Sequence, residues 1–284
     1  MTNVSSTDAY KIAMAQAGFP LREETFYLSF RKGGWQFIPF DLVAEVKKML
    51  PKAKDISMSF LEGHGYNFTP AMVESLTRQV QIRAAPPKSW VYEREPILTV
   101  TGPSFVVSWL EARVLRLFFP IQLATEIVRG SVQEGSLRCA CDEQLQIVRR
   151  VIYSVAEDQL SDLSKHCTSQ PDHYAAAVQT NAEKLLELLI PSRIFEVGMR
   201  SATCEEQHDI CLRTLKGLGI DGTSNTGISA NWGLIPVGTM GHEHVQRWGD
   251  DLSAFRAMRD MRVSRPTYLL DTFNTITRGI PAAI

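Results

Sequence analysis

The sequence lacks any strong excess of charge and any long apolar run. Its 30 lysine and arginine residues almost balance 31 aspartate and glutamate residues, and no long block of one sign occurs. This balance provides no basic footprint for nucleic acid or for an anionic membrane surface. No segment approaches the roughly 18 consecutive apolar residues of a membrane helix, and the polar residues at 2–8 do not resemble a signal peptide. We therefore expect a cytoplasmic protein that binds neither nucleic acid nor membrane.

Cysteine is also scarce, and it does not form a metal-binding pattern. The five cysteines are odd in number and widely spread, and a chain of this size does not need disulfides to stabilise it. Only Cys139 and Cys141 lie close together. A zinc site needs about four convergent ligands, and no second pair follows at a suitable spacing. We expect reduced, buried or half-buried thiols.

What the sequence does contain is enough apolar material for a large core, since 44% of its 284 residues are hydrophobic.

Thr7 is a good helix cap, and Gly18 and Pro20 end the first helix. Pro120 marks a boundary, because a helix tolerates proline in its first turn but not in its interior. We predict helices at 8–17, 40–50, 105–119 and from 121, strands at 24–30 and 91–100, and a basic turn at 31–34. Residues 1–118 are predicted to form a layered N-terminal α/β domain.

The second part of the chain begins with helices and ends with a repeated strand-then-helix pattern. Helical stretches at 122–163 and 174–189 lead to short apolar segments that each end in small or polar residues. Such units, spaced about 15 to 30 residues apart, are typical of a parallel sheet, either doubly wound or in a β/α barrel. We predict an incomplete β/α barrel over residues 119–284, with strands at 194–200, 218–225, 235–242 and 267–272.

The carboxyl ends of these strands carry the residues with the most chemistry. In both architectures the loops at these ends converge on the ligand site. A guanidinium suits phosphate, turns rich in glycine and hydroxyls present backbone amides to anions, and an imidazole can titrate. A carboxylate suits ribose hydroxyls or magnesium. The pattern therefore predicts a site for a phosphate-bearing substrate, formed by Glu196, Arg200, the turn at 222–225, Thr239, His242, Asp271 and Thr272.

Each of these features also has a structural explanation. The turn at 222–225 and Asp271 can simply cap the helices that follow. A single histidine is more often structural than functional, although His242 follows a double-glycine turn at a strand end. The other histidines, including His208 and His244, lack that context, and we expect them to be structural.

Seven short blocks along the chain follow one another in the order found in a known family. They lie at residues 7–14, 30–32, 95–103, 196–200, 221–225, 238–243 and 270–272. Any one block is a weak signal, whereas the ordered series is a strong one. The series resembles the type II phosphoribosyltransferases, and among them the N-terminal portion of the nicotinate phosphoribosyltransferases. The regions around 50–90 and 130–190 carry least of this resemblance.

The resemblance implies an activity in NAD salvage. The 5-phosphoribosyl group passes from phosphoribosyl pyrophosphate to the ring nitrogen of nicotinate, which yields nicotinate mononucleotide and pyrophosphate. The resemblance also implies that ATP hydrolysis is coupled through a phosphohistidine and that Mg2+ accompanies phosphoribosyl pyrophosphate and ATP. A homodimer with shared active sites is the implied assembly.

The same resemblance assigns roles to individual residues. In the matching positions His242 is the phosphohistidine, and Tyr10 is the ring that a neighbouring subunit stacks on the pyridine. Arg31 and Arg200 contact phosphate, and Asp271 lies near the ribose. The predicted substrate site is completed by Glu196, Val197, Thr223, Ser224 and Thr239.

Two departures from the family pattern leave alternatives open. Relatives usually have phenylalanine where this chain has Val197, and the lost stacking face is worth on the order of 1 kcal/mol, so a nicotinamide-type enzyme is one alternative. The chain also ends at Ile284, before the family's remaining barrel strands, and half a barrel would expose an unpaired edge. We therefore keep two further hypotheses, namely an active enzyme whose remaining strands lie outside this sequence and an inactive truncated homologue that acts as a structural or regulatory subunit.

Overall fold

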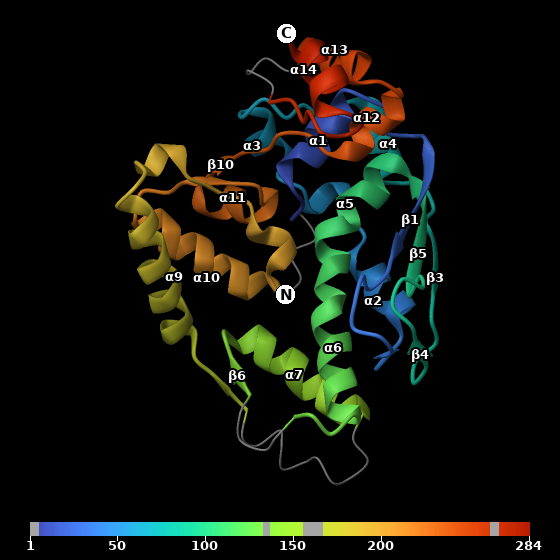
Figure 1. Cartoon of the computed structure of the whole chain (residues 1–284), viewed down its shortest axis with the longest axis vertical. Coiled ribbons are helices and arrows are strands. Elements are labelled where there is room, and N and C mark those ends of the chain that lie inside the picture. The colour runs from blue at the N-terminus through green and yellow to red at the C-terminus, as the bar shows by residue number, and fades with distance from the viewer. Residues whose placement is uncertain (1–5, 133–136, 156–166, 262–266) are drawn as a thin grey trace.

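The computed structural model describes residues 6–132, 137–155, 167–261 and 267–284 (Figure 1). The chain is mixed α/β, as the sequence predicts. Its first part contains α1 (Ala9–Gln16), β1 (Glu23–Leu28), β2 (Gln36–Phe37), α2 (Leu42–Met49), η1 (Ala53–Asp55), α3 (Met58–Glu62), α4 (Pro70–Ser75), β3 (Gln81–Ala84), β4 (Trp90–Val91), β5 (Leu98–Pro103) and α5 (Ser104–Val114).

The second part is richer in helix. It contains η2 (Leu115–Leu117), α6 (Phe118–Val128), β6 (Arg138–Cys139), α7 (Asp142–Val155), β7 (Thr168–Ser169), α9 (Pro171–Leu186), η3 (Pro191–Arg193), β8 (Phe195–Glu196), η4 (Gly198–Ser201), α10 (Glu205–Gly217), β9 (Gly222–Thr223), α11 (Thr226–Trp232), β10 (Ile235–Pro236), α12 (His242–Trp248), α13 (Asp251–Met261), the π-helical η5 (Thr275–Gly279) and α14 (Ile280–Ala283).

The N-terminal sheet is antiparallel, with strand order β1-β5-β3. Glu23 lies opposite Pro103 and Leu28 opposite Leu98, so β1 and β5 pair over six residues. Alternate residues of β5 are buried, as expected for a strand with one face on a core. Helix α5 packs on β1 and β5, and Figure 1 shows the sheet beside the long column of α5 and α6. The predicted layered α/β arrangement is therefore present.

The helical column does not break at proline. Pro120 lies in the first turn of α6, and α5, η2 and α6 follow one another without a gap. The predicted helix at 122–163 is wrong in its middle. Helix α6 ends at Val128, and β6 precedes the next helix, α7, which begins at Asp142. Residues 156–163 lie outside the described part of the chain.

The C-terminal sheet is parallel and has strand order β10-β9-β8. Phe195 and Ile235 both pair with Gly222, from opposite sides of β9. Helix α10 follows β8, α11 follows β9 and α12 follows β10, which confirms three of the predicted strand-then-helix units. Among the described residues these three strands do not close on themselves, so the barrel itself stays a prediction.

The fourth predicted strand is not formed. Residues 267–271 belong to no helix or strand, because their apolar side chains pack on the core beside α13 instead of joining β10. Tyr268 stacks on Phe255 with ring centroids 4.7 Å apart, and Leu269 and Leu270 contact the same cluster.

One hydrophobic cluster joins the two ends of the chain. Ile12 of α1, Trp109 of α5, Val245 of α12 and Phe255 of α13 are all buried in it. Helix α1 therefore packs against segments more than 200 residues later in the sequence. No helix in the described ranges combines the length and apolar character needed to cross a membrane.

Candidate active site

A cavity of about 600 Å3 opens where the start of α1 meets the ends of the parallel strands. Its wall is largely apolar, with a guanidinium, a carboxylate and several hydroxyls among the lining groups. The lining residues are Asp8, Tyr10, His64, Tyr66, Phe195, Val197, Arg200, Ser224, Ile235, Pro236, Val237, Gly238, Thr239 and Thr267. Five predicted site residues meet here, namely Tyr10, Val197, Arg200, Ser224 and Thr239.

The start of α1 is held against the strand ends by its backbone. The Ala9 amide donates to the Ser224 carbonyl at 2.7 Å, and Asp8 forms a bridge with Asn225. A Cβ added at Gly238 would lie 2.7 Å from the Tyr10 nitrogen, so glycine is required at this contact.

Tyr10 lies in the cavity of its own chain. The packing of α1 against Gly238 brings the tyrosine to this cavity, and the expectation that a neighbouring subunit also supplies this ring stays a prediction. Burial raises the pKa of Tyr10 to about 12, so the ring stays a neutral phenol. It provides an aromatic face without a negative charge.

Arg200 is the cation of the cavity. It lies in η4, directly after β8, and its side chain is 46% exposed. Its Nε lies 3.6 Å from Asp8 Oδ2, and its Nη1 lies 3.5 Å from Glu111 Oε1. These loose ion pairs orient the guanidinium while leaving donors for a phosphate.

Glu196 lies between two residues that line the cavity, Phe195 and Val197, and both of its carboxylate oxygens accept hydrogen bonds. Oε1 accepts a hydrogen bond from the Gly198 amide at 2.5 Å, and Oε2 accepts from Thr223 Oγ1 and His208 Nε2, each at 2.9 Å. Burial opposes ionisation, but these hydrogen bonds, led by that from His208, lower the pKa of Glu196 below its usual value. Glu196 and Thr223 thus form a hydrogen bond with each other and do not line the cavity in this structure.

A second charged group lies behind the cavity. Lys11 is 1% exposed and contacts both Glu111 and Glu243, the latter at 2.6 Å. Ser108 Oγ also donates to Glu243 at 2.6 Å. Burial opposes the charge on Lys11, but the two carboxylates raise the pKa of its ammonium. Together with the Arg200 pairs, this forms a chain of alternating charges that extends from the cavity to α12.

His242 is the first residue of α12 and is exposed. Its Nδ1 lies 3.2 Å from Thr272 Oγ1, so the turns at 239–242 and 271–272 meet at this contact. Asp271 is exposed beside Thr272. His242 and Asp271 do not line the cavity, and Arg31 lines a different cavity of about 580 Å3 at the end of β1.

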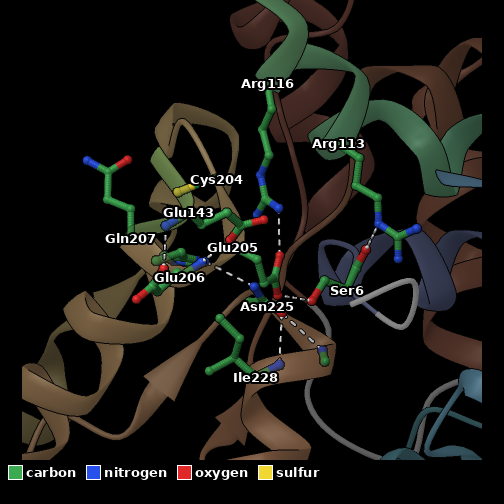
Figure 2. Close-up of polar contacts among 12 residues, drawn as sticks. Ser6, Arg113, Arg116, Glu143, Cys204, Glu205, Glu206, Gln207, Asn225 and Ile228 are labelled. Atoms are coloured by element: carbon green, nitrogen blue, oxygen red, sulfur yellow. Dashed lines mark hydrogen bonds and ion pairs between the residues drawn. The ribbon is translucent and has the colours of Figure 1, made fainter. Parts of the chain in front are cut away.

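Hydrogen bonds and an ion pair hold the first turn of α10, the helix that follows β8 and η4 (Figure 2). Arg116 donates to Glu205 at 2.6 Å, and Ser6 donates to the same carboxylate. Glu143 and Glu206 each accept a hydrogen bond from the other's backbone amide, at 2.7 and 2.8 Å. These contacts fix the first turn of α10 against the column of α5 and α6 and against α7.

Cysteine burial matches the expectation, since Cys139, Cys141, Cys167 and Cys204 are buried and Cys211 is half-buried. Cys141 and Cys204 lie at the starts of α7 and α10, with their sulfurs 3.4 Å apart. The described residues contain no group of three or more histidine, cysteine, aspartate or glutamate side chains that could hold a metal ion.

Sequence reasoning missed Lys11, Glu111 and the importance of His208. Each lies on a helix with no strand-end context, and its partners come from distant segments. His208 is buried, as a structural histidine should be, yet it contacts the carboxylate at the end of β8. His244 is structural as expected, since it is buried and its Nε2 lies 3.1 Å from the Ala254 carbonyl, and burial lowers its pKa.

Similarity to known proteins is found among solved structures and not at the level of sequence. No family model matches the sequence, and no curated protein matches it. The structure of nicotinate phosphoribosyltransferase from Porphyromonas gingivalis is similar, with a TM-score of 0.52 and 16% identity over 92% of this chain and 60% of that one. That of nicotinate phosphoribosyltransferase from Vibrio cholerae has a TM-score of 0.51 and 17% identity over 92% of this chain and 58% of that one. The chain therefore shares their fold and spans about 60% of their length.

Proposed function

We propose that this chain is the N-terminal part of a nicotinate phosphoribosyltransferase that forms nicotinate mononucleotide and pyrophosphate from nicotinate and phosphoribosyl pyrophosphate in NAD biosynthesis. The observation that carries the proposal is the cavity in which Tyr10, Arg200 and Ser224 meet. The shared fold supports it. A cytoplasmic location and a homodimeric assembly belong to the same proposal.

The cavity offers separate positions for the base and the phosphate. The neutral ring of Tyr10 stacks on the pyridine, and Val197 covers the other side with an aliphatic surface. Arg200 binds a phosphate oxygen and holds the ribose against the base. Transfer passes through a cationic sugar, so holding both reactants in line and stabilising the leaving pyrophosphate lower the barrier.

We further propose that ATP is coupled through His242. Its Nδ1 is engaged by the Thr272 hydroxyl, so Nε2 is the nucleophile for the γ-phosphate of ATP. A bond forms between Nε2 and phosphorus while the bond to ADP breaks. The new charge on His242 lies next to Glu243, whose ion pair with Lys11 connects α12 with α1 and, through Glu111, with Arg200.

Magnesium enters this proposal only as an ion carried by phosphoribosyl pyrophosphate and ATP. The described residues do not provide a ligand cluster of the size a protein-held metal needs. Asp8 is the carboxylate of the cavity, and it faces Arg200. We therefore derive no step through a metal fixed by this chain.

The test of the coupling uses the natural full-length protein and ATP labelled in the γ-phosphate. We expect a protein-bound phosphate that is labile in acid and stable in base, as phosphohistidine is, and His242→Ala should abolish it. His173→Ala, which changes an exposed histidine on α9, is the matched control and should retain the label. Label that survives His242→Ala would refute the assignment.

Val197 favours a second candidate, a transferase for nicotinamide. Its side chain is 62% exposed in the cavity wall and offers the base an aliphatic surface there, so this position selects less strictly between pyridine bases. Parallel assays of nicotinate and nicotinamide with phosphoribosyl pyrophosphate decide between the two. An inactive homologue would form no mononucleotide from either base.

A further inference from the structure

His208 of α10 is buried between Glu196 and Asn225, and both of its ring nitrogens have partners. The side chain is 2% exposed. Nε2 lies 2.9 Å from Glu196 Oε2, and Nδ1 lies 3.0 Å from Asn225 Nδ2. The ring thus connects β8 with the turn that follows β9.

The orientation of Asn225 determines which nitrogen of His208 carries the proton. Asn225 caps α11, and its Oδ1 accepts from the amides of Gly227 and Ile228, each at 3.0 Å. Its Nδ2 therefore faces the ring, and an amide nitrogen can only donate. His208 Nδ1 must accept, so the proton lies on Nε2 and is donated to Glu196.

Glu196 also contacts η4, the segment that carries Arg200. Its other oxygen accepts from the amide of Gly198, the first residue of η4. A Cβ at Gly198 would lie 2.7 Å from that oxygen, so the carboxylate and the start of η4 fit closely. Arg200 is two residues further on, with its guanidinium in the cavity wall.

We propose that His208 is a positioning residue: held as the Nε2–H tautomer between Asn225 and Glu196, it fixes the carboxylate that orients η4 and thereby sets Arg200 for the phosphate group of the substrate. His208 does not itself line the cavity. The inference deepens the proposed function and rests on it for the identity of the substrate. The hydrogen bonds that link Asn225, His208, Glu196 and Gly198 do not depend on which substrate binds.

The experiment uses two conservative variants that separate the two ring nitrogens. In His208→Gln the amide nitrogen replaces Nε2 and still donates to Glu196, whereas in His208→Asn the side chain reaches only Asn225. We expect the asparagine variant to raise KM for phosphoribosyl pyrophosphate roughly tenfold, while kcat and KM for nicotinate change little. The glutamine variant should stay close to the wild type, and His173→Gln on the surface of α9 is the matched control.

Binding of inorganic pyrophosphate, measured by calorimetry, repeats the comparison without turnover. The asparagine variant should again be weaker than the glutamine variant. An absence of mononucleotide formation by the wild type would refute the proposed function, while the pyrophosphate comparison would still decide the role of His208. Equal pyrophosphate affinities in the two variants would overturn that role.

The tautomer is measured in the wild type, so the inference holds or fails even if a variant does not fold. Nitrogen-15 NMR of histidine-labelled full-length protein distinguishes a protonated ring nitrogen from an unprotonated one. We expect His208, assigned by its loss in a variant or by selective labelling, to carry its proton on Nε2. A proton on Nδ1 would overturn the proposal.

Discussion

Lys11→Met tests the buried charge chain behind the cavity most directly. Methionine keeps most of the volume of the lysine but removes its charge, which leaves Glu111 and Glu243 without the ammonium that both contact. Removing one partner of a buried ion pair destabilises a protein by about 3–5 kcal/mol. Since a domain has on the order of 5–15 kcal/mol of stability in total, such a loss is easily measured by urea unfolding.

The pH dependence identifies the cause of this loss. In the wild type Lys11 helps to lower the pKa of Glu243, so this carboxylate contributes stability above its ordinary pKa and loses that contribution as pH falls through the lowered value. Without Lys11, burial is opposed only by the Ser108 hydrogen bond and by Arg247, so the pKa of Glu243 should rise, and its protonation in acid removes a poorly compensated buried charge. The deficit of the variant should therefore be largest near neutral pH and smaller in acid.

Lys48→Met is the matched control. Lys48 pairs with Glu45 at 2.8 Å but is 63% exposed, and exposed pairs contribute about 0–1 kcal/mol. Two results would refute the reasoning. One is an equal loss in the two lysine variants, and the other is a Lys11→Met deficit that does not change with pH.

Three further predictions concern the contacts around the cavity. Gly238→Ala should cost about 1–3 kcal/mol of unfolding free energy by overpacking, since the new Cβ would lie 2.7 Å from the Tyr10 nitrogen; an unfolding midpoint equal to that of the wild type would contradict this contact. Val197→Phe should lower KM for the pyridine several-fold, as a second stacking face worth about 0.5–1.5 kcal/mol predicts, and an unchanged KM would mean that Val197 does not face the ring. Burial opposes ionisation of Glu205, yet Arg116 lowers its pKa, so stability should fall as pH drops below the ordinary glutamate pKa; Glu205→Gln should flatten this part of the pH profile measured by thermal unfolding.

The sequence predicts the strand ends of the C-terminal sheet because short apolar segments followed by small or polar residues are a local pattern. It fails at 267–272 for a non-local reason. The residues there have high β propensity, but Tyr268 finds a stacking partner in Phe255, and tertiary packing overrides local preference.

The same distinction applies to the site. Arg200 and Ser224 could be predicted to meet because the carboxyl ends of neighbouring parallel strands lie side by side. Lys11 and His208 could not, since nothing local distinguishes a helical lysine or histidine that is buried and paired from one in solvent. Lys11 finds Glu243 at a separation of 232 residues, and only the fold reveals such a pair.

The docking of α1 on the loop after β10 has a consequence for biosynthesis. Tyr10 leaves the ribosome early, but its place in the cavity wall is against Gly238, near the other end of the described chain. At about 5–20 residues per second, the N-terminal helix waits on the order of 10 to 50 s for its partner. During that interval the apolar face that α1 presents to Trp109 and Phe255 is only partly covered, because Phe255 has not yet been made.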